Sequence, residues 1–427
     1  MEALYQKYLS SGKVSTDTRN IPEGAIFFAL KGPSFNANQF ALEALDKGAA
    51  FAVIDEEAYQ KDERMVLVKD VLRTLQELAQ YHRQKLKIPI IGLTGSNGKT
   101  TTKELIREVL SPKYKVLATK GNLNNHIGVP LTLLSIHPEV EIAVIEMGAN
   151  HIGEIAQLCE IAQPTHGLIT NIGKAHIEGF GGFEGVIRGK SELYHYLIQN
   201  GGEVFINSQD EILNNMAKRF DKPYFYPGPE DYLTCTLIDA DPFVTYKNES
   251  GVLVKTQLVG AYNFSNIAAA LCLGKFFDIP EEEADGAIAQ YVPANNRSQV
   301  IQKGSNTIIL DAYNANPNSM EAALENLKAM KAGYKVVILG DMFELGADSE
   351  FEHERIAALA ESSAFGSVLL CGALFSKVKN ENSRAQYFGE KQGLINYLKE
   401  VTLKDSAILL KGSRGMGLEE VLESINN

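Results

Sequence analysis

The sequence predicts an α/β protein of three domains, two of them built on parallel sheets. The chain has 427 residues, more than one ordinary hydrophobic core organises. Short apolar runs alternate with helix-like segments over most of its length, which is the order that forms βαβ units. A glycine-containing turn joins one such run to a helix at residues 94–101, as in domains that bind nucleotide phosphates.

Residues 1–87 form the first predicted domain, a small α/β unit. The strand-like runs GAIFFAL (24–30) and AAFAVID (49–55) lie on either side of a short helix, 41–48. A longer segment with apolar residues near helical spacing, 71–86, leads into the next domain.

Residues 88–297 form the predicted central domain, and residues 298–427 a smaller one of the same style. The central domain begins with the β-rich run IPIIGL (88–93), and its further strand-like runs are KVLAT (115–119), EIAVIEM (141–147), THGLITN (165–171) and EVFIN (203–207). The last domain has four such runs, NTIILDAY (306–313), YKVVILGD (334–341), SVLLCG (367–372) and SAILLKG (406–412). Helix-like sequence between most of these runs predicts a mainly parallel sheet in the central domain and a Rossmann-like, doubly wound sheet in the last.

The composition excludes several classes of protein. Charged residues make up 22% and hydrophobic residues 45%, which excludes a disordered chain or a fibre. The net charge of −12 argues against nucleic-acid binding, and no apolar run approaches the ~18 residues of a membrane span. The opening MEALYQKYLS has no basic-then-apolar leader, and the four cysteines form no CxxC pair: Cys159, Cys235, Cys272 and Cys371. We therefore expect a cytoplasmic protein.

The segment IPIIGLTGSNGKTTTKELIREVL reads as a strand, a glycine-bearing loop and a helix. Gly95 and Gly98 permit tight turns that let backbone amides converge on phosphate oxygens, and the helix adds its N-terminal dipole. Lys99 can reach the β- and γ-phosphates, and Thr100 can offer a hydroxyl to Mg²⁺. The spacing departs from GxxxxGK[ST], so a plain glycine turn is the alternative, but the flanking strand and helix favour a nucleotide site.

Polar side chains follow the strands of the central domain. Glu146 comes directly after the apolar run IAVI, and His176 follows the run GLIT after a short loop. Ligands of open parallel sheets lie beyond the carboxyl ends of the strands, so both side chains can approach the phosphates. Taken singly, Glu146 can equally be a carboxylate near a helix N-terminus, and His176 a surface histidine.

Lys190 lies on the inward face of a predicted helix. The segment FEGVIRGKSELYHYLIQNGG ends at Gly201, and its apolar stripe places Lys190 between Val186 and Leu193. A buried ammonium is costly unless it is paired or altered. The pattern favours a lysine whose ammonium reaches water at the edge of this face, and the alternative is a lysine that pairs with phosphate or is modified.

Three polar loops follow strands of the last domain: AYNANPNSM after Asp311, GDMFELG (340–346) and KGSRGMG (411–417). Each is also a plausible plain turn. At the carboxyl ends of adjacent parallel strands, however, they form one side of a cleft for a second substrate.

These pieces together resemble the Mur ligase family of ATP-dependent amide ligases. The resemblance covers nearly the whole chain, and the phosphate-loop spacing is the one that this family uses. The motifs that carry it are STDTR (15–19), GAIFFALKG (24–32), TGSNGKTT (94–101), GNLNNHIGVP (121–130), IEMGA (145–149), TNIGKAH (170–176), KSELY (190–194), GAYNFSNIAAA (260–270), NRSQ (296–299), DAYNANPNSM (311–320), LGDMFELG (339–346) and KGSR (411–414).

The resemblance implies a role for each matching residue. The ATP phosphates would be held by Thr94, Gly95, Ser96, Asn97, Gly98, Lys99, Thr100 and Thr101. The adenosine would be contacted by Asn263, Asn266, Arg297 and Asp311, and two Mg²⁺ sites formed by Thr100, Glu146, His176 and, if carbamylated, Lys190. The implied catalytic residues are Lys99, Glu146, His176 and Lys190. The UDP-substrate would be bound by Ser15, Thr16, Asp17, Thr18, Arg19, Asn124 and Asn125, and the incoming dipeptide by Asn314, Asn316 and Arg414.

The chain departs from the family pattern at three positions. Tyr262 replaces the usual histidine before the adenine-side asparagine. In the first domain, Asn36 and Asn38 stand where acidic and histidine residues are usual, which puts uracil and diphosphate contacts there in question.

Within the family, DAYNANPNSM and LGDMFELG favour the member that joins D-alanyl-D-alanine to UDP-N-acetylmuramoyl-tripeptide. The resemblance then implies that ATP phosphorylates the tripeptide carboxylate and that the dipeptide amine attacks the acyl phosphate. It also implies that the last domain closes onto the central one during the reaction. We expect the active enzyme to be a monomer. Two alternatives stay open: another Mur-type or folylpolyglutamate-type ligase, and a nucleotide-gated ATPase or binding protein that ligates nothing.

Overall fold

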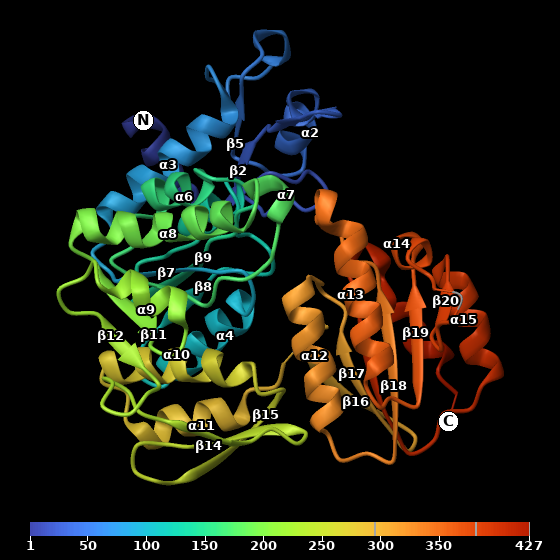
Figure 1. Ribbon diagram of the computed structural model, residues 1–427. Helices are drawn as coiled ribbons and strands as arrows, with labels where there is room; N and C mark the ends of the chain where they lie inside the picture. The colour runs from blue at the N-terminus through green and yellow to red at the C-terminus, as the bar shows by residue number, and fades with distance from the viewer. Residues whose placement is uncertain (294–295, 381, 427) are drawn as a thin grey trace.

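The computed structural model describes residues 1–293, 296–380 and 382–426. It contains three α/β blocks, each around its own sheet, with the last block standing beside the central one and α12 (Pro317–Ala329) on the facing side (Figure 1). The three-domain α/β class is confirmed. The exact boundaries at 87 and 297 stay predictions.

The first block holds a four-stranded parallel sheet in the order β1-β2-β5-β6. Its strands are β1 (Val14–Ser15), β2 (Ile26–Phe28), β5 (Phe51–Ile54) and β6 (Met65–Leu67), and a hairpin of β3 (Lys31–Gly32) and β4 (Phe35–Asn36) lies outside the sheet. The helices are α1 (Glu2–Ser11), α2 (Ala41–Asp46) and α3 (Val71–Lys85). All four strands point the same way, so the loops that follow them share one edge.

The helix α3 joins the first block to the central one. It lies against α5 (Gly128–Leu133) and α6 (Glu154–Ala162), and one apolar cluster runs from Leu4 to Ala217 across both blocks. The buried guanidinium of Arg83 on α3 donates to the carbonyls of Ala162 and Gln163 at the end of α6, both at 2.9 Å. These two blocks therefore share packing as well as chain connectivity.

The central block holds six parallel strands in the order β12-β11-β10-β7-β9-β8. Neighbouring residues of β7 enter opposite cores, since Ile90 packs with α6 and α8 (Phe183–Asn200) while Ile91 packs with α4 (Lys99–Leu110) and α10 (Asn263–Phe276). The sheet strands are β7 (Ile90–Thr94), β8 (Val116–Ala118), β9 (Ile142–Glu146), β10 (His166–Ile169), β11 (Glu203–Asn207) and β12 (Tyr224–Tyr226), and the shorter helices are α7 (Ile177–Phe180) and α9 (Glu211–Ala217).

The strand order makes β7 the switch point of the central sheet. The chain continues from β7 to β8 and β9 on one side, and to β10, β11 and β12 on the other. Connections therefore leave in opposite directions at the carboxyl end of β7, which is where open α/β sheets bind ligands.

An antiparallel sheet extends the central block and was not foreseen. It contains β13 (Thr236–Asp239), β14 (Phe243–Lys247) and β15 (Leu253–Val259), and is followed by α10 and α11 (Glu281–Gln290). Alternate residues of β15 are buried, so its period of two was readable in LVKTQLV. The expectation of a mainly parallel sheet holds only for the six-stranded part.

The last block is doubly wound, with the strand order β16-β17-β21-β18-β19-β20. The edge strand β16 is antiparallel and the other neighbours are parallel. Two apolar clusters, one on each face, bury α12 and α13 on one side and α15 on the other. The strands are β16 (Gln299–Lys303), β17 (Asn306–Asp311), β18 (Tyr334–Gly340), β19 (Ser367–Cys371), β20 (Gln386–Phe388) and β21 (Ser406–Lys411), and the remaining helices are α13 (Ser349–Ser362), α14 (Ala373–Lys377) and α15 (Lys391–Glu400).

No helix in the described part of the chain is both long and apolar enough to cross a membrane. All four cysteines are free and buried.

Candidate active site

The phosphate loop follows β7 and requires glycine at two positions. Gly95 has φ +147°, and a Cβ there would lie 2.0 Å from Thr170 Oγ1. Gly98 has φ +78°, and a Cβ there would lie 2.4 Å from Asn266 Oδ1. Gly98 is also the N-cap of α4 and brings no side-chain cap, so the first amides of α4 remain available for an anion.

The loop opens onto a cavity of about 860 Å³ between the central and last blocks. The cavity is lined by residues from the phosphate loop, from the strand ends of the central sheet and from the loops of the last block. The sequence-predicted residues that line it are Ser96, Asn97, Gly98, Lys99, Thr100, Thr101, Asn124, Asn125, Glu146, His176, Asn263, Asn266, Arg297, Asp311, Asn314 and Arg414.

Glu146, at the end of β9, is the carboxylate nearest the loop. Thr100 Oγ1 donates to its Oε2 at 2.9 Å, and Asn124 Nδ2 donates to its Oε1 at 2.8 Å. One carboxylate and one hydroxyl facing a phosphate cavity suit a magnesium ion, which usually takes few protein ligands and completes its shell with water and phosphate oxygens. The described residues contain no group of three or more His, Cys, Asp or Glu that could hold a metal ion.

Lys103 carries a buried ammonium close to Glu146 that was not predicted from the sequence. Lys103 Nζ lies 3.8 Å from Glu146 Oε2 and 3.9 Å from Glu104 Oε1, with its side chain 3% exposed. Burial lowers the pKa of Lys103, while Glu146 opposes that shift. Its position was readable, because Lys103 is three residues before the buried Ile106 on the same helical face as Thr100.

His176 meets the last block. It adopts a left-handed backbone conformation at the start of α7, and its Nδ1 lies 2.5 Å from Glu344 Oε2. The contact has ion-pair distance without hydrogen-bond alignment, and the imidazole lowers the pKa of Glu344. His176 therefore lies at the edge of the cavity where the two blocks touch.

Lys190 is buried on α8, as the inward-face pattern required, and does not line the cavity. Its side chain is nearly inaccessible, so a lysine that reaches water at the edge of the face is wrong. Its Nζ donates to the carbonyl of Ala149 at 2.9 Å and lies 4.9 Å from the ring centre of Phe180. Burial lowers the pKa of Lys190 well below the usual range. Ala149 itself lines the cavity, so Lys190 stands one residue behind the wall.

The asparagines of α10 form a chain against the phosphate-loop helix. Asn266 Nδ2 donates to Asn263 Oδ1 at 2.9 Å, and Thr102 Oγ1 donates to Asn266 Oδ1 at 3.0 Å. Tyr262, in place of the family's histidine, shares a 2.7 Å hydrogen bond with Ser298 Oγ. The tyrosine thus ties α10 to the start of the last block.

Positive charge reaches the cavity from Arg297, at the junction of the two blocks, and from the end of β21 with the loop that follows it. Lys411 Nζ lies 2.6 Å from Asp311 Oδ2, and both residues line the cavity. The guanidiniums of Arg297 and Arg414 lie 3.6 and 4.9 Å from the ring centre of Tyr313, so one ring contacts both arginines. Lys411 and Tyr313 were within recognised motifs but had not been assigned a role.

The candidate UDP-binding segment lies apart from this cavity. Ser15 ends β1, and Thr16 to Arg19 follow at the carboxyl edge of the first sheet. Arg19 and Asp17 pair with each other at 2.7 Å in solvent, and Lys47 Nζ donates to the carbonyl of Thr18 at 2.9 Å. The segment is therefore placed on the first block and not among the residues that line the cavity.

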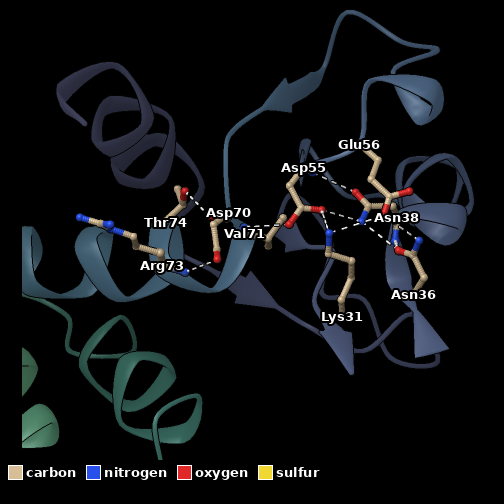
Figure 2. Close-up of polar contacts among 9 residues, drawn as sticks. All are labelled: Lys31, Asn36, Asn38, Asp55, Glu56, Asp70, Val71, Arg73 and Thr74. Atoms are coloured by element: carbon tan, nitrogen blue, oxygen red, sulfur yellow. Dashed lines mark hydrogen bonds and ion pairs between the residues drawn. The ribbon is translucent and has the colours of Figure 1, made fainter. Parts of the chain in front are cut away.

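Asn36 and Asn38, the two departures in the first block, are engaged with the protein itself (Figure 2). Asn38 is 1% exposed and exchanges two hydrogen bonds with Asp55, from its Nδ2 at 2.8 Å and to its Oδ1 at 3.0 Å. Asp55 also pairs with Lys31 at 3.0 Å and accepts from the amide of Val71 at 3.3 Å. Asn38 therefore holds the turn that follows β4 onto Asp55 at the end of β5, and Asp55 in turn contacts the start of α3.

The remaining predicted residues differ in exposure to the cavity. Asn125 Oδ1 accepts from the amide of Gly128 at 2.9 Å while the residue lines the cavity. Asn314 also lines it, and its carbonyl accepts from Lys411 at 3.2 Å. Asn316, in contrast, is buried and is not among the lining residues.

Comparison with known proteins agrees with this geometry. Residues 93–274 match the Mur ligase middle domain, and residues 296–414 match the Mur ligase, glutamate ligase domain. The chain belongs to the Mur ligase family.

Relatives of this Mur ligase are similar over nearly their whole length. It is 35% identical to the UDP-N-acetylmuramoyl-tripeptide--D-alanyl-D-alanine ligase of Bacillus subtilis over 96% of this chain and 92% of that protein. It superposes on a crystal structure of MurF from Acinetobacter baumannii with a TM-score of 0.88 and 29% identity, covering 99% and 98% of the two chains. It also superposes on MurF ligase from Thermotoga maritima in complex with ADP, with a TM-score of 0.86 and 27% identity over 97% of each chain.

Proposed function

We propose that this chain is an ATP-dependent amide ligase that joins D-alanyl-D-alanine to UDP-N-acetylmuramoyl-tripeptide, a step of peptidoglycan precursor synthesis. The observation that carries the proposal is one cavity in which a phosphate loop, the carboxylate Glu146 and the cations Arg297, Lys411 and Arg414 converge from two blocks. The near full-length similarity to ligases of this specificity supports the choice of substrates.

The reaction begins with transfer of the γ-phosphoryl group of ATP to the terminal carboxylate of the tripeptide, which gives an acyl phosphate and ADP. Both reacting groups are anionic, so the loop amides and Lys99 must hold and screen the phosphates. The amine of D-alanyl-D-alanine then adds to the acyl carbon, and the tetrahedral intermediate loses phosphate and a proton to leave the new amide.

Magnesium would be held by Thr100 and Glu146, where it would neutralise the charge that develops on the phosphoryl oxygens. His176 is the proposed ligand of a second ion. Asn124 supports this arrangement because it fixes Glu146 by a 2.8 Å hydrogen bond while Thr100 holds the other oxygen. The fixed carboxylate costs little reorganisation during the reaction.

Lys190 is proposed to carry a carbamate in the active enzyme. A buried amine with a depressed pKa has a larger neutral fraction, and the neutral amine adds to CO₂ with loss of one proton. The product replaces a buried cation with a carboxylate-like anion beside the cavity wall at Ala149. The burial of Lys190 and the hydrogen bond from its Nζ to the carbonyl of Ala149 support this step.

The remaining site roles follow the same proposal. Asn263, Asn266, Arg297 and Asp311 are proposed to contact adenosine, with Asp311 on the ribose. The segment from Ser15 to Arg19 is proposed to bind the UDP moiety, with Asn124 and Asn125 near the peptide. Asn314 and Arg414 are proposed to face the incoming dipeptide, for whose carboxylate a guanidinium is a suitable partner.

A coupled phosphate-release assay tests the proposal. ATP, Mg²⁺ and UDP-N-acetylmuramoyl-tripeptide should give rapid phosphate release only when D-alanyl-D-alanine is added. The product should be heavier than the tripeptide substrate by the mass of D-alanyl-D-alanine less one water. Free D-alanine and D-glutamate are the control acceptors, and a preference for either would mark a different ligase. ATP turnover that ignores both co-substrates would instead mark a nucleotide-gated ATPase.

We also propose that the enzyme works as a monomer in the cytoplasm. Sedimentation at working enzyme concentration should give a single species of about one chain mass, and an activity that rises faster than protein concentration would contradict it.

A further inference from the structure

We propose that Asn316 is a positioning residue that docks the last block onto the phosphate loop, and not a ligand of the incoming dipeptide. Its Nδ2 donates to Asn97 Oδ1 at 2.7 Å, across the interface between the two blocks. The proposal rests on the proposed ligase function only for its kinetic readout.

The amide of Asn316 is aimed by the helix that it caps. Its Oδ1 accepts from the amide of Ser319 at 3.0 Å, and its own amide donates to Ser319 Oγ at 3.0 Å, which is a capping box. Pro317 occupies the first turn of α12 and fixes the backbone there. With Oδ1 engaged by the cap and Nδ2 by the phosphate loop, both polar atoms of this buried side chain already have protein partners.

Asn97 receives this hydrogen bond on a side chain that has no other partner in the described part of the chain. Its backbone is held by the central block, since its amide donates to Asn171 Oδ1 at 3.0 Å and its carbonyl accepts from Thr170 Oγ1 at 2.6 Å. Its Oδ1 is left for Asn316. This hydrogen bond therefore joins the last block directly to the phosphate loop.

The segment that backs the phosphate loop makes the next contacts of the same interface. The amide of Lys174 donates to Asn318 Oδ1 at 2.7 Å, and Lys174 Nζ pairs with Glu352 at 2.9 Å. Glu352 is a buried carboxylate on α13, and its other oxygen accepts from Arg355 at 2.8 Å. These contacts and Asn316 hold α12 and α13 against the phosphate loop and the segment behind it.

Docking of this kind places the last block's share of the cavity over the nucleotide site. Asp311 and Lys411 line the cavity from the last block, and Asn97 lines it from the phosphate loop. A nucleotide that touches both sides binds more tightly when the blocks are docked, and by linkage it favours docking in return.

The test is a double-mutant cycle of Asn316→Ser and Asn97→Ala. Serine keeps the N-cap but is too short to reach Asn97, while Ser319→Ala disturbs only the capping box and serves as the control. We expect each of the two single variants to weaken ADP binding about 2- to 12-fold in calorimetry, the span of one neutral hydrogen bond. We expect the double variant to match either single, because both remove the same contact.

Scattering and kinetics complete the cycle. Both variants should raise the average radius of gyration with ADP bound and lower kcat, with little change in the KM for D-alanyl-D-alanine. A raised dipeptide KM with unchanged ADP affinity and radius would overturn the proposal in favour of a dipeptide contact, as would additive effects on ADP binding. ADP affinity and scattering need no ligase activity, so failure of the ligase proposal would leave this test intact.

Discussion

Replacing Gly98 with alanine should destabilise the phosphate loop by an amount that two separate terms explain. Gly98 has φ +78° and ψ −7°, a left-handed conformation that costs an alanine about 1–2 kcal/mol. The new Cβ would also lie 2.4 Å from Asn266 Oδ1, closer than any real contact, so the asparagine must move.

The second term comes from what Asn266 loses when it moves. Its amide accepts from Thr102 at 3.0 Å and donates to Asn263 at 2.9 Å, and each neutral hydrogen bond contributes about 0.5–1.5 kcal/mol. The two terms together predict that Gly98→Ala lowers the free energy of unfolding by about 2–5 kcal/mol. Urea denaturation, followed by fluorescence or circular dichroism, measures this difference.

Gly12→Ala is the matched control, because Gly12 ends α1 with φ 64° and ψ 6° and has nothing within 4 Å of its Cβ position. It should show the backbone term alone, about 1–2 kcal/mol. Gly98→Ala should fall to the same value in an Asn266→Ala background, where the clash is gone. An unchanged cost in that background would show that the close approach of Asn266 does not explain the requirement for glycine.

Three further predictions follow from buried groups. Lys190→Ala should abolish ligation and regain part of it with short carboxylic acids, whereas Lys190→Arg should stay inactive under the same rescue; full activity of Lys190→Ala would remove the carbamate. Arg83→Met should lower the free energy of unfolding by about 2–4 kcal/mol in urea denaturation, because it leaves two carbonyls at the end of α6 without their charged donor. The exposed Arg73→Met is the control and should lower it by under about 0.5 kcal/mol. Equal losses would contradict the role of Arg83 in joining α3 to α6. Burial lowers the pKa of His166 to about 4. Between about pH 6.5 and about pH 4 the imidazole is therefore protonated in the unfolded chain and neutral in the folded chain. The free energy of unfolding should fall as the pH drops from about 6.5 to about 4. The slope from this residue is at most about 1.4 kcal/mol per pH unit, and His166→Asn should flatten the measured pH dependence; an identical profile would contradict the assignment.

Local pattern determined most of the elements and the core of the site. The helix predicted at 71–86 is α3 (Val71–Lys85), and the one that should end at Gly201 is α8 (Phe183–Asn200), with Gly201 as its left-handed cap. Strand, turn and helix at residues 88–110 were readable because glycine positions, apolar period and a lysine after the turn are all local features. The inward face of Lys190 followed from helical spacing for the same reason.

The antiparallel sheet β13–β15 was missed although its alternation was visible. Its strands carry exposed residues on one face, so the runs are less apolar than the buried parallel strands that were recognised. The buried Lys103 was missed because a lysine on a helix is ordinarily solvated, and only the carboxylates of Glu104 and Glu146 make its burial tolerable.

By itself, the sequence determined the α/β class, the phosphate loop and the family, since these depend on residue types at fixed short spacings. Only the tertiary structure decided which distant side chains line one cavity and which form hydrogen bonds within the protein instead. Asn38 stands where the family pattern has another residue type near the UDP-substrate, and Asn316 was predicted to contact the dipeptide, yet Asn38 bonds to Asp55 and Asn316 to Asn97. A side-chain amide offers only a few hydrogen-bonding positions, and whether they face a ligand or a neighbour depends on packing between segments far apart in the chain.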